Sequence, residues 1–126
     1  MRDSNAIKEH EERVNQEKER LNKIFKEIPD DKKKATQGLI IQAARMRVLL
    51  DDAWIDIQKN GDYELFTQSE NTPAYERERP IAKLYNSRDA SYQKIIQQLI
   101  KLLPDEVVEE KKADNTLKGL LNNENK

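Results

Sequence analysis

The sequence contains no cysteine, only three glycines and a single histidine. The absence of cysteine excludes disulfide bonds and thiolate metal ligands. Three glycines are too few for a Gly-rich loop that cradles the phosphates of a nucleotide, so we expect no cofactor. No apolar run approaches the roughly 20 residues that a membrane-spanning helix needs, and the N-terminus is too polar for a signal peptide. These absences predict a soluble intracellular protein with no membrane partner.

Apolar residues are also scarce, because 36% of the 126 residues are hydrophobic and 37% are charged. The length suits one domain, and a domain of this size buries only a modest fraction of its surface. A core built by one copy alone would be thin, so we expect long helices that share apolar surface with neighbouring copies. The net charge of −1 provides no global attraction for nucleic acid or membrane.

Apolar residues seven apart predict an N-terminal amphipathic helix within residues 1–28. Ile7, Val14, Leu21 and Ile28 form this stripe, but His10 occupies one of the positions between them. A coiled coil needs apolar residues at both seam positions. The first two turns are therefore expected to pack only in an assembly.

Residues 29–104 are predicted to form a helical hairpin that is the oligomerisation core. Pro29 can open its first helix, which runs to about Lys59 and stops at Asn60-Gly61. That helix has two nearly opposite apolar faces, which suggests one face inside the subunit and one against a neighbour. The first face consists of Leu39, Ala43, Met46, Leu50, Ala53 and Ile57, and the second of Ile41, Ala44, Val48 and Ile55.

A long connection at residues 60–79 precedes the second helix of the hairpin, which opens at Pro80 and ends at Pro104. Tyr63 to Phe66 and Ala74-Tyr75 could pair within the connection as short strands. The expected fold class is therefore all-α, with a possible short β pair at 60–79 and a ring-type homo-oligomer. Residues 105–126 are predicted to be a flexible acidic tail, with four basic residues against six acidic ones.

The residue types present argue against catalysis. His10 sits in a charged helix without partners for a catalytic triad, and we interpret it as a surface or seam residue. Asp51, Asp52 and Asp56 could in principle bind a divalent metal. Their spacing to Arg47 and Lys59 is, however, ordinary for ion pairs on a helix, so we expect no metal site and no enzyme activity.

Two clusters of basic residues are the remaining candidates. Lys32, Lys33 and Lys34 are consecutive near a helix start, where backbone N–H groups also attract phosphate. The alternative is a solvated charge run beside Asp30 and Asp31. The second cluster comprises Arg77, Arg79 and Arg88, which we interpret mainly as ion-pair residues whose nearby partners are Glu76, Glu78 and Asp89.

The segment TPAYERERPIAKLYNSRDASYQKIIQQLIKLLP, together with KIFKEIPDDKKKATQGLIIQAARMRVLLDDAW, resembles the small terminase subunits of tailed bacteriophages. The resemblance spans about residues 8–104 and is most specific in RPIAKLYN and LIIQAARMRVLLDD. It implies a helical, non-catalytic ring that recognises viral double-stranded DNA, recruits the large terminase subunit, which is an ATPase and nuclease, and acts in the cytoplasm of the infected bacterial host. The front half carries an excess of only one positive charge, which argues against strong sequence-specific DNA binding.

Charge and position, rather than a family motif, select the residues for each role. We expect DNA to be bound by Lys32, Lys33, Lys34, Arg45, Arg47, Lys23 and Arg20. We expect copies to contact one another through Ile41, Val48, Ile55, Arg88, Tyr92, Ile95 and Leu99. We expect the large subunit to dock on Leu117, Leu120 and Leu121 of the tail. The alternative function is a helical oligomeric scaffold or regulatory adaptor that does not bind DNA.

Overall fold

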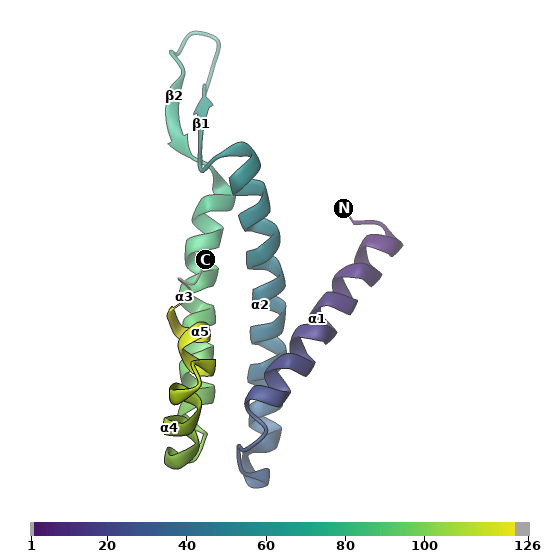
Figure 1. Ribbon diagram of the computed structural model, residues 1–126. Coiled ribbons are helices and arrows are strands. Elements are labelled where there is room, and N and C mark those ends of the chain that lie inside the picture. The colour runs from purple at the N-terminus through teal and green to yellow at the C-terminus, as the bar shows by residue number, and fades with distance from the viewer. Residues whose placement is uncertain (1, 123–126) are drawn as a thin grey trace.

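The computed structural model describes residues 2–122 of the chain, and the side chains of residues 2–120. It is mostly helical with one short two-stranded antiparallel sheet, which confirms the expected fold class at that level. The elements, in the order shown in Figure 1, are α1 (Ser4–Ile24), the 3₁₀ turn η1 (Asp30–Lys32), α2 (Lys33–Asn60), β1 (Tyr63–Phe66), β2 (Tyr75–Glu78), α3 (Pro80–Lys101), α4 (Asp105–Ala113) and α5 (Thr116–Asn122).

The helices α2 and α3 run side by side in opposite directions and form the long axis of the molecule (Figure 1). The first predicted face of α2 supplies buried Ala43, Leu50 and Ala53, and α3 contributes Ile96 and Leu99 to the shared core. The predicted stop is also present. Gly61 follows α2 with a φ of 82°, and its N–H donates to the carbonyl of Ile57 at 2.7 Å.

The helix α1 packs on α2 with its C-terminal half and diverges from α2 toward its N-terminus (Figure 1). Val14 and Leu21 are buried, whereas Ile7 is 46% exposed. The helix ends at Ile24 rather than at the predicted Ile28. Ile28 lies in the turn after α1, where it is still buried in the core, so the apolar spacing correctly marked the residue but not the end of the helix.

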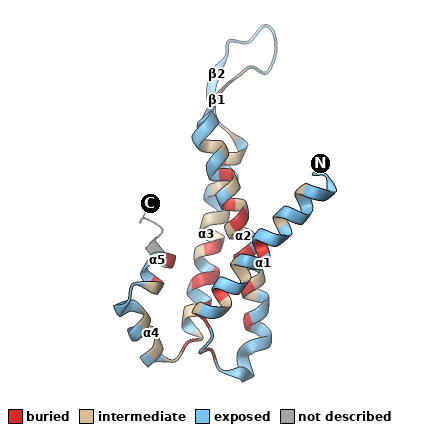
Figure 2. Ribbon diagram, turned by 45° about the vertical axis from the view of Figure 1, so that its right-hand side comes forward, coloured by how far each residue is buried: buried red, intermediate tan, exposed pale blue. Residues whose placement is uncertain are grey.

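The strands form a hairpin that projects beyond the end of α2 and α3 (Figures 1 and 2). Tyr63 pairs with Glu78 and Phe66 with Tyr75, so β2 extends further than the predicted pair. Across the strands, Arg77 Nε donates to Glu64 Oε2 at 2.7 Å, and its guanidinium carbon lies 3.5 Å from the centre of the Phe66 ring. On this face of the hairpin, the side chains of Arg77, Glu64 and Phe66 therefore cover one another.

The base of the hairpin is tied to the helices by Arg79. Its guanidinium donates to the carbonyl oxygen of Gly61 at 2.6 Å and to Asp56 Oδ1 at 2.7 Å. Arg77 and Arg79 therefore are ion-pair residues, as expected, but their partners are Glu64 and Asp56 instead of Glu76 and Glu78. Strand pairing selects Glu64, because it is directly opposite Arg77 on the same face.

The tail that was expected to be flexible forms two helices, α4 and α5, with a turn at Asp114-Asn115, and α5 packs back on α3. Leu117 is fully buried and Leu120 is 7% exposed, so both join the main core, as the buried part of α5 in Figure 2 indicates. Lys111 Nζ lies 3.8 Å from Glu27 Oε2 and links α4 to the turn after α1. The tail leucines are spaced by three residues and therefore share one helix face, which lets α5 dock as a unit.

Within residues 2–122, no helix is both long and apolar enough to cross a membrane.

Candidate nucleic-acid interface

The corner between α1 and α2 presents the largest part of the predicted basic surface. Phe25 and Ile28 are each only 2% exposed and anchor the turn in the core. Across the two helices, the side-chain amide of Gln37 donates to Asn22 Oδ1 at 3.1 Å. The last turn of α1 and the first turn of α2 are therefore held in a fixed arrangement.

Lysines from both helices surround this corner. Lys23, Lys32 and Lys34 are exposed, and none of them forms an ion pair with another residue in the range 2–122. Lys33 lies 3.1 Å from Asp30, but this pair is on the surface, where its contribution is at most about 1 kcal/mol. Exposed Lys26 extends the set and was missed from the sequence, although its position between Lys23 and the lysine run could have indicated it. We call Lys23, Lys26, Lys32, Lys33 and Lys34 the lysine corner.

The start of α2 does not offer the free backbone donors that the sequence suggested. The N–H groups of Lys32 and Lys33 donate to the carbonyls of Pro29 and Asp30 in the 3₁₀ turn. Asp30 and Asp31 also lie in this turn and oppose an anion there. Attraction of phosphate at the corner must therefore come from the lysine side chains.

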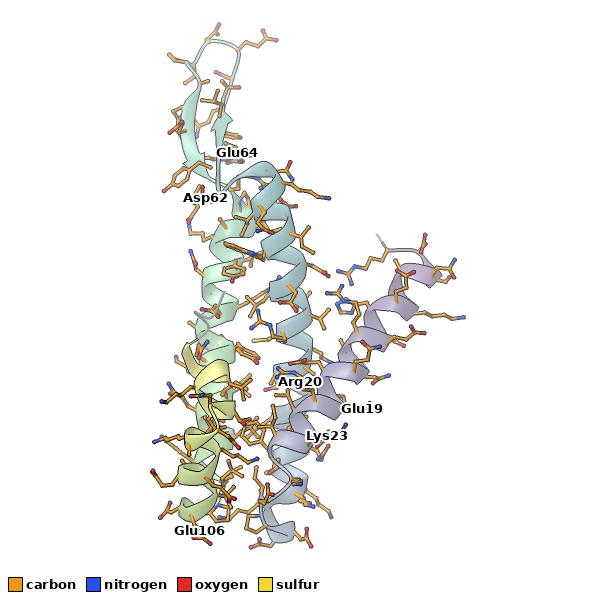
Figure 3. All side chains as sticks on the ribbon, in the orientation of Figure 1. Glu19, Arg20, Lys23, Asp62, Glu64 and Glu106 are labelled. Atoms are coloured by element: carbon orange, nitrogen blue, oxygen red, sulfur yellow. The ribbon has the colours of Figure 1, made fainter. Side chains whose placement is uncertain are left out.

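Two of the expected DNA-binding arginines are engaged within the chain. Arg20 donates to both carboxylate oxygens of Glu17, at 2.9 and 2.6 Å, and this hydrogen bonding raises the pKa of Arg20. Arg47 lies 3.1 Å from Asp51 and 5.0 Å from the centre of the Tyr92 ring. Arg20 and Arg47 are thus neutralised locally, and Arg20 lies further up α1 than Lys23 (Figure 3).

Arg45 is exposed, but it lies apart from the lysine corner. It follows Lys34 by eleven positions, which is about 16 Å along α2. Arg45 instead lines an open groove of about 500 Å³ between α1 and α2, together with Arg2, Lys18 and half-buried His10. We call this space the α1–α2 groove.

The three aspartates considered as metal ligands point to three different arginines. Asp51 pairs with Arg47 as predicted, at 3.1 Å. Asp52 accepts from Arg13 at 2.7 Å, and Asp56 accepts from Arg79 at 2.7 Å. The hydrogen bond from Arg79 is the main cause that lowers the pKa of Asp56. No group of three or more potential metal ligands gathers anywhere in residues 2–122.

The expected interface between copies requires revision, because four of its residues are inside the chain's own core. Val48, Tyr92, Ile95 and Leu99 are 8% exposed or less. Burial also raises the pKa of Tyr92 above its ordinary value. The core is thicker than the composition predicts, because α1 and α5 add apolar residues to it.

The other three residues of that expected interface are more accessible. Ile55 is 50% exposed, and Ile41 is half-buried in the wall of the α1–α2 groove. Arg88 is half-buried and forms no ion pair with any described residue. Its expected partner Asp89 follows it directly on α3, and neighbouring helix residues do not face one another.

The expected docking leucines Leu117 and Leu120 are also buried in the core, and the side chain of Leu121 lies outside the described residues. A partner could reach the two buried leucines only if α5 left its site.

The chain matches no protein-family model, no curated protein and no solved structure.

Proposed function

We propose that this protein is a phage small terminase subunit, a non-catalytic ring-forming adaptor that binds viral double-stranded DNA for genome packaging. The observation that carries the proposal is the lysine corner, where lysines from the end of α1, the following turn and the start of α2 are exposed and mostly free of ion pairs. The resemblance in the RPIAKLYN and LIIQAARMRVLLDD segments points in the same direction. The fixed α1–α2 corner would hold these charges as a unit.

One lysine corner is a weak DNA site, because its few contacts must compete with salt. Each phosphate that a protein neutralises contributes about −0.9 to the slope of log K against log salt. A ring repeats the corner around its axis, so the phosphate contacts add up. The proposed self-association and the proposed DNA binding therefore depend on one another.

Apolar surface remains for self-association at the hairpin end of α2 and α3, where α1 does not cover them (Figure 2). Trp54, Ile55 and Leu84 are each about half exposed, between 48% and 50%. In our proposal Ile55 is kept from the expected interface, and Trp54 and Leu84 replace the residues of that interface that are buried.

For the large terminase subunit we propose the outer face of α4 in place of the tail leucines. Asp105, Glu106, Glu109 and Glu110 are exposed there, and Glu106 points away from the bundle (Figure 3). This acidic face remains available while Leu117 and Leu120 stay in the core.

Fluorescence anisotropy with a labelled DNA duplex tests the proposal. We expect binding near 50 mM salt that weakens steeply toward 200 mM. The absence of binding at 50 mM by the assembled protein would refute the DNA role. That result would favour the alternative function, an oligomeric scaffold without DNA binding, which the net charge of −1 also favours.

A further inference from the structure

The β-hairpin has one face that its own side chains do not cover. Tyr63 and Leu65 are 56% and 74% exposed. The strand register places them on the same face as their partners Glu78 and Glu76, because directly paired residues share a face. A two-stranded hairpin alone is marginally stable in water. We call this surface, with Tyr63, Leu65, Glu76 and Glu78, the hairpin face.

The hairpin also carries excess negative charge. Residues 61–79 contain five acidic residues and two basic ones, a net charge of −3. Both arginines already form ion pairs, Arg77 with Glu64 and Arg79 with Asp56. The other four acidic residues of the hairpin form no ion pair within residues 2–122, and they are Asp62, Glu70, Glu76 and Glu78. A surface that covers the hairpin face must therefore be apolar with basic surroundings.

The α1–α2 groove has that composition. Its apolar lining comes from both helices and consists of Ile7, Val14, Ile41 and Leu49. Its basic lining consists of Arg2, Lys18 and Arg45, against the single acidic residue Glu11. Lys18 and Arg45 form no ion pair with another described residue, so their charges are available to a partner.

We propose that the hairpin face of one copy docks in the α1–α2 groove of a second copy. Tyr63 and Leu65 would cover the apolar lining, while Glu76 and Glu78 would face Lys18 and Arg45. One chain cannot make this contact with itself, because its hairpin points away from its own groove (Figures 1 and 2).

Two other occupants fit less well. Two hairpin faces packed on each other would oppose Glu76 and Glu78 of one copy to the same carboxylates of the other, which is unfavourable. A DNA phosphate backbone would leave the apolar lining uncovered and would meet Glu11. The charge and the apolar lining together favour a second copy.

The contact joins two different surfaces, so each copy can use its hairpin toward one neighbour and its groove toward the other. Such head-to-tail contacts close into a ring when the rotation between copies closes, and otherwise build a filament. The inference rests on the self-association in the proposed function and adds a second contact to the apolar surface of Trp54, Ile55 and Leu84.

Charge reversal on either side tests the contact, with the mass of the assembly measured by sedimentation velocity. Glu76→Lys with Glu78→Lys reverses the hairpin face, and Lys18→Glu with Arg45→Glu reverses the groove. Each variant alone should weaken assembly about tenfold or more, because like charges then face each other. An equimolar mixture of the two variants should assemble again, since every hairpin then finds an oppositely charged groove. A chain with all four substitutions should also assemble.

The absence of native cysteine allows a second, independent test. A mixture of Leu65→Cys chains and Ile41→Cys chains should form a disulfide-linked pair. Ser87→Cys, at an exposed position on α3, replaces Leu65→Cys in the control and should not cross-link with Ile41→Cys. Circular dichroism checks that every variant keeps its helices.

The outcomes separate this contact from the proposed function. A wild-type monomer at high micromolar concentration overturns both. If the wild type assembles and neither charge reversal changes its mass, the hairpin–groove contact is overturned, but the proposed ring is not. Groove variants that keep their mass but lose DNA binding also overturn the contact, in favour of a phosphate site in the groove.

Discussion

The packing of α5 on the core makes the substitution Leu117→Ala informative. Leu117 has no exposed surface and lies in the main core cluster. Replacing a buried leucine by alanine costs about 2–5 kcal/mol. We expect the lower end of this range, about 2–3 kcal/mol, because α5 is short and can move to fill the cavity. Once α5 has left the core completely, this substitution cannot lower the free energy of unfolding any further.

Urea unfolding at one fixed protein concentration measures this effect, because assembly also contributes to the apparent stability. The matched control is Lys118→Ala, which changes an exposed residue on the same helix and should stay within about 0.5 kcal/mol of the wild type. If Leu117→Ala is as stable as Lys118→Ala, α5 does not contribute to the stability of the core, contrary to the packing described above.

Two further predictions concern titrating groups. The pKa of Asp56 is lowered in the folded state by its hydrogen bond from Arg79, so the associated stability is present above the ordinary value of 3.8 and is lost as pH falls below it. Between pH 5 and 2.5 the unfolding temperature of the wild type should therefore fall more steeply than that of Asp56→Asn. Parallel curves would contradict a stabilising contact between Asp56 and Arg79. The pKa of Tyr92 is raised, chiefly by burial, so the folded state resists its ionisation and loses stability as pH rises above about 10. Ultraviolet titration of Tyr92→Phe should lack one of the tyrosine steps with a raised pKa, and the loss of an ordinary step near pH 10 would contradict the burial.

The sequence predicts α2 and α3 well, because their signals are local, but it does not predict α4 and α5, where a flexible tail was expected. Asn60-Gly61 and Pro80 mark helix ends that follow from backbone chemistry alone. The apolar residues at alternating steps along α2 likewise identify core positions, since Ala43 and Leu50 are buried in the common core. The sequence indicates the β-hairpin less clearly, because its strand pairing depends on contacts of Arg77 with Glu64 and Phe66 across a long loop.

The candidate site was less predictable, because it depends on which side chains meet in space. Arg20 and Arg47 have the same charge as Lys32, and only the folded chain distinguishes them by their contacts with Glu17 and Asp51. The sequence places Tyr92 at an interface between copies because it does not show that Arg47 of α2 and Glu17 and Arg20 of α1 lie near it in the folded chain. In each case the deciding factor is a tertiary contact, which helix propensity and apolar spacing do not reveal.

We propose that the lysine corner binds DNA, and the salt dependence of the DNA affinity distinguishes this corner from the other exposed lysines. We predict that Lys23→Gln/Lys32→Gln/Lys34→Gln lowers affinity and reduces the salt slope by up to about 3 for each corner that contacts DNA. Lys59→Gln/Lys83→Gln/Lys94→Gln removes the same charge from exposed positions elsewhere and should retain nearly the wild-type slope. Equal slopes for the two triple variants would contradict a DNA interface at the lysine corner.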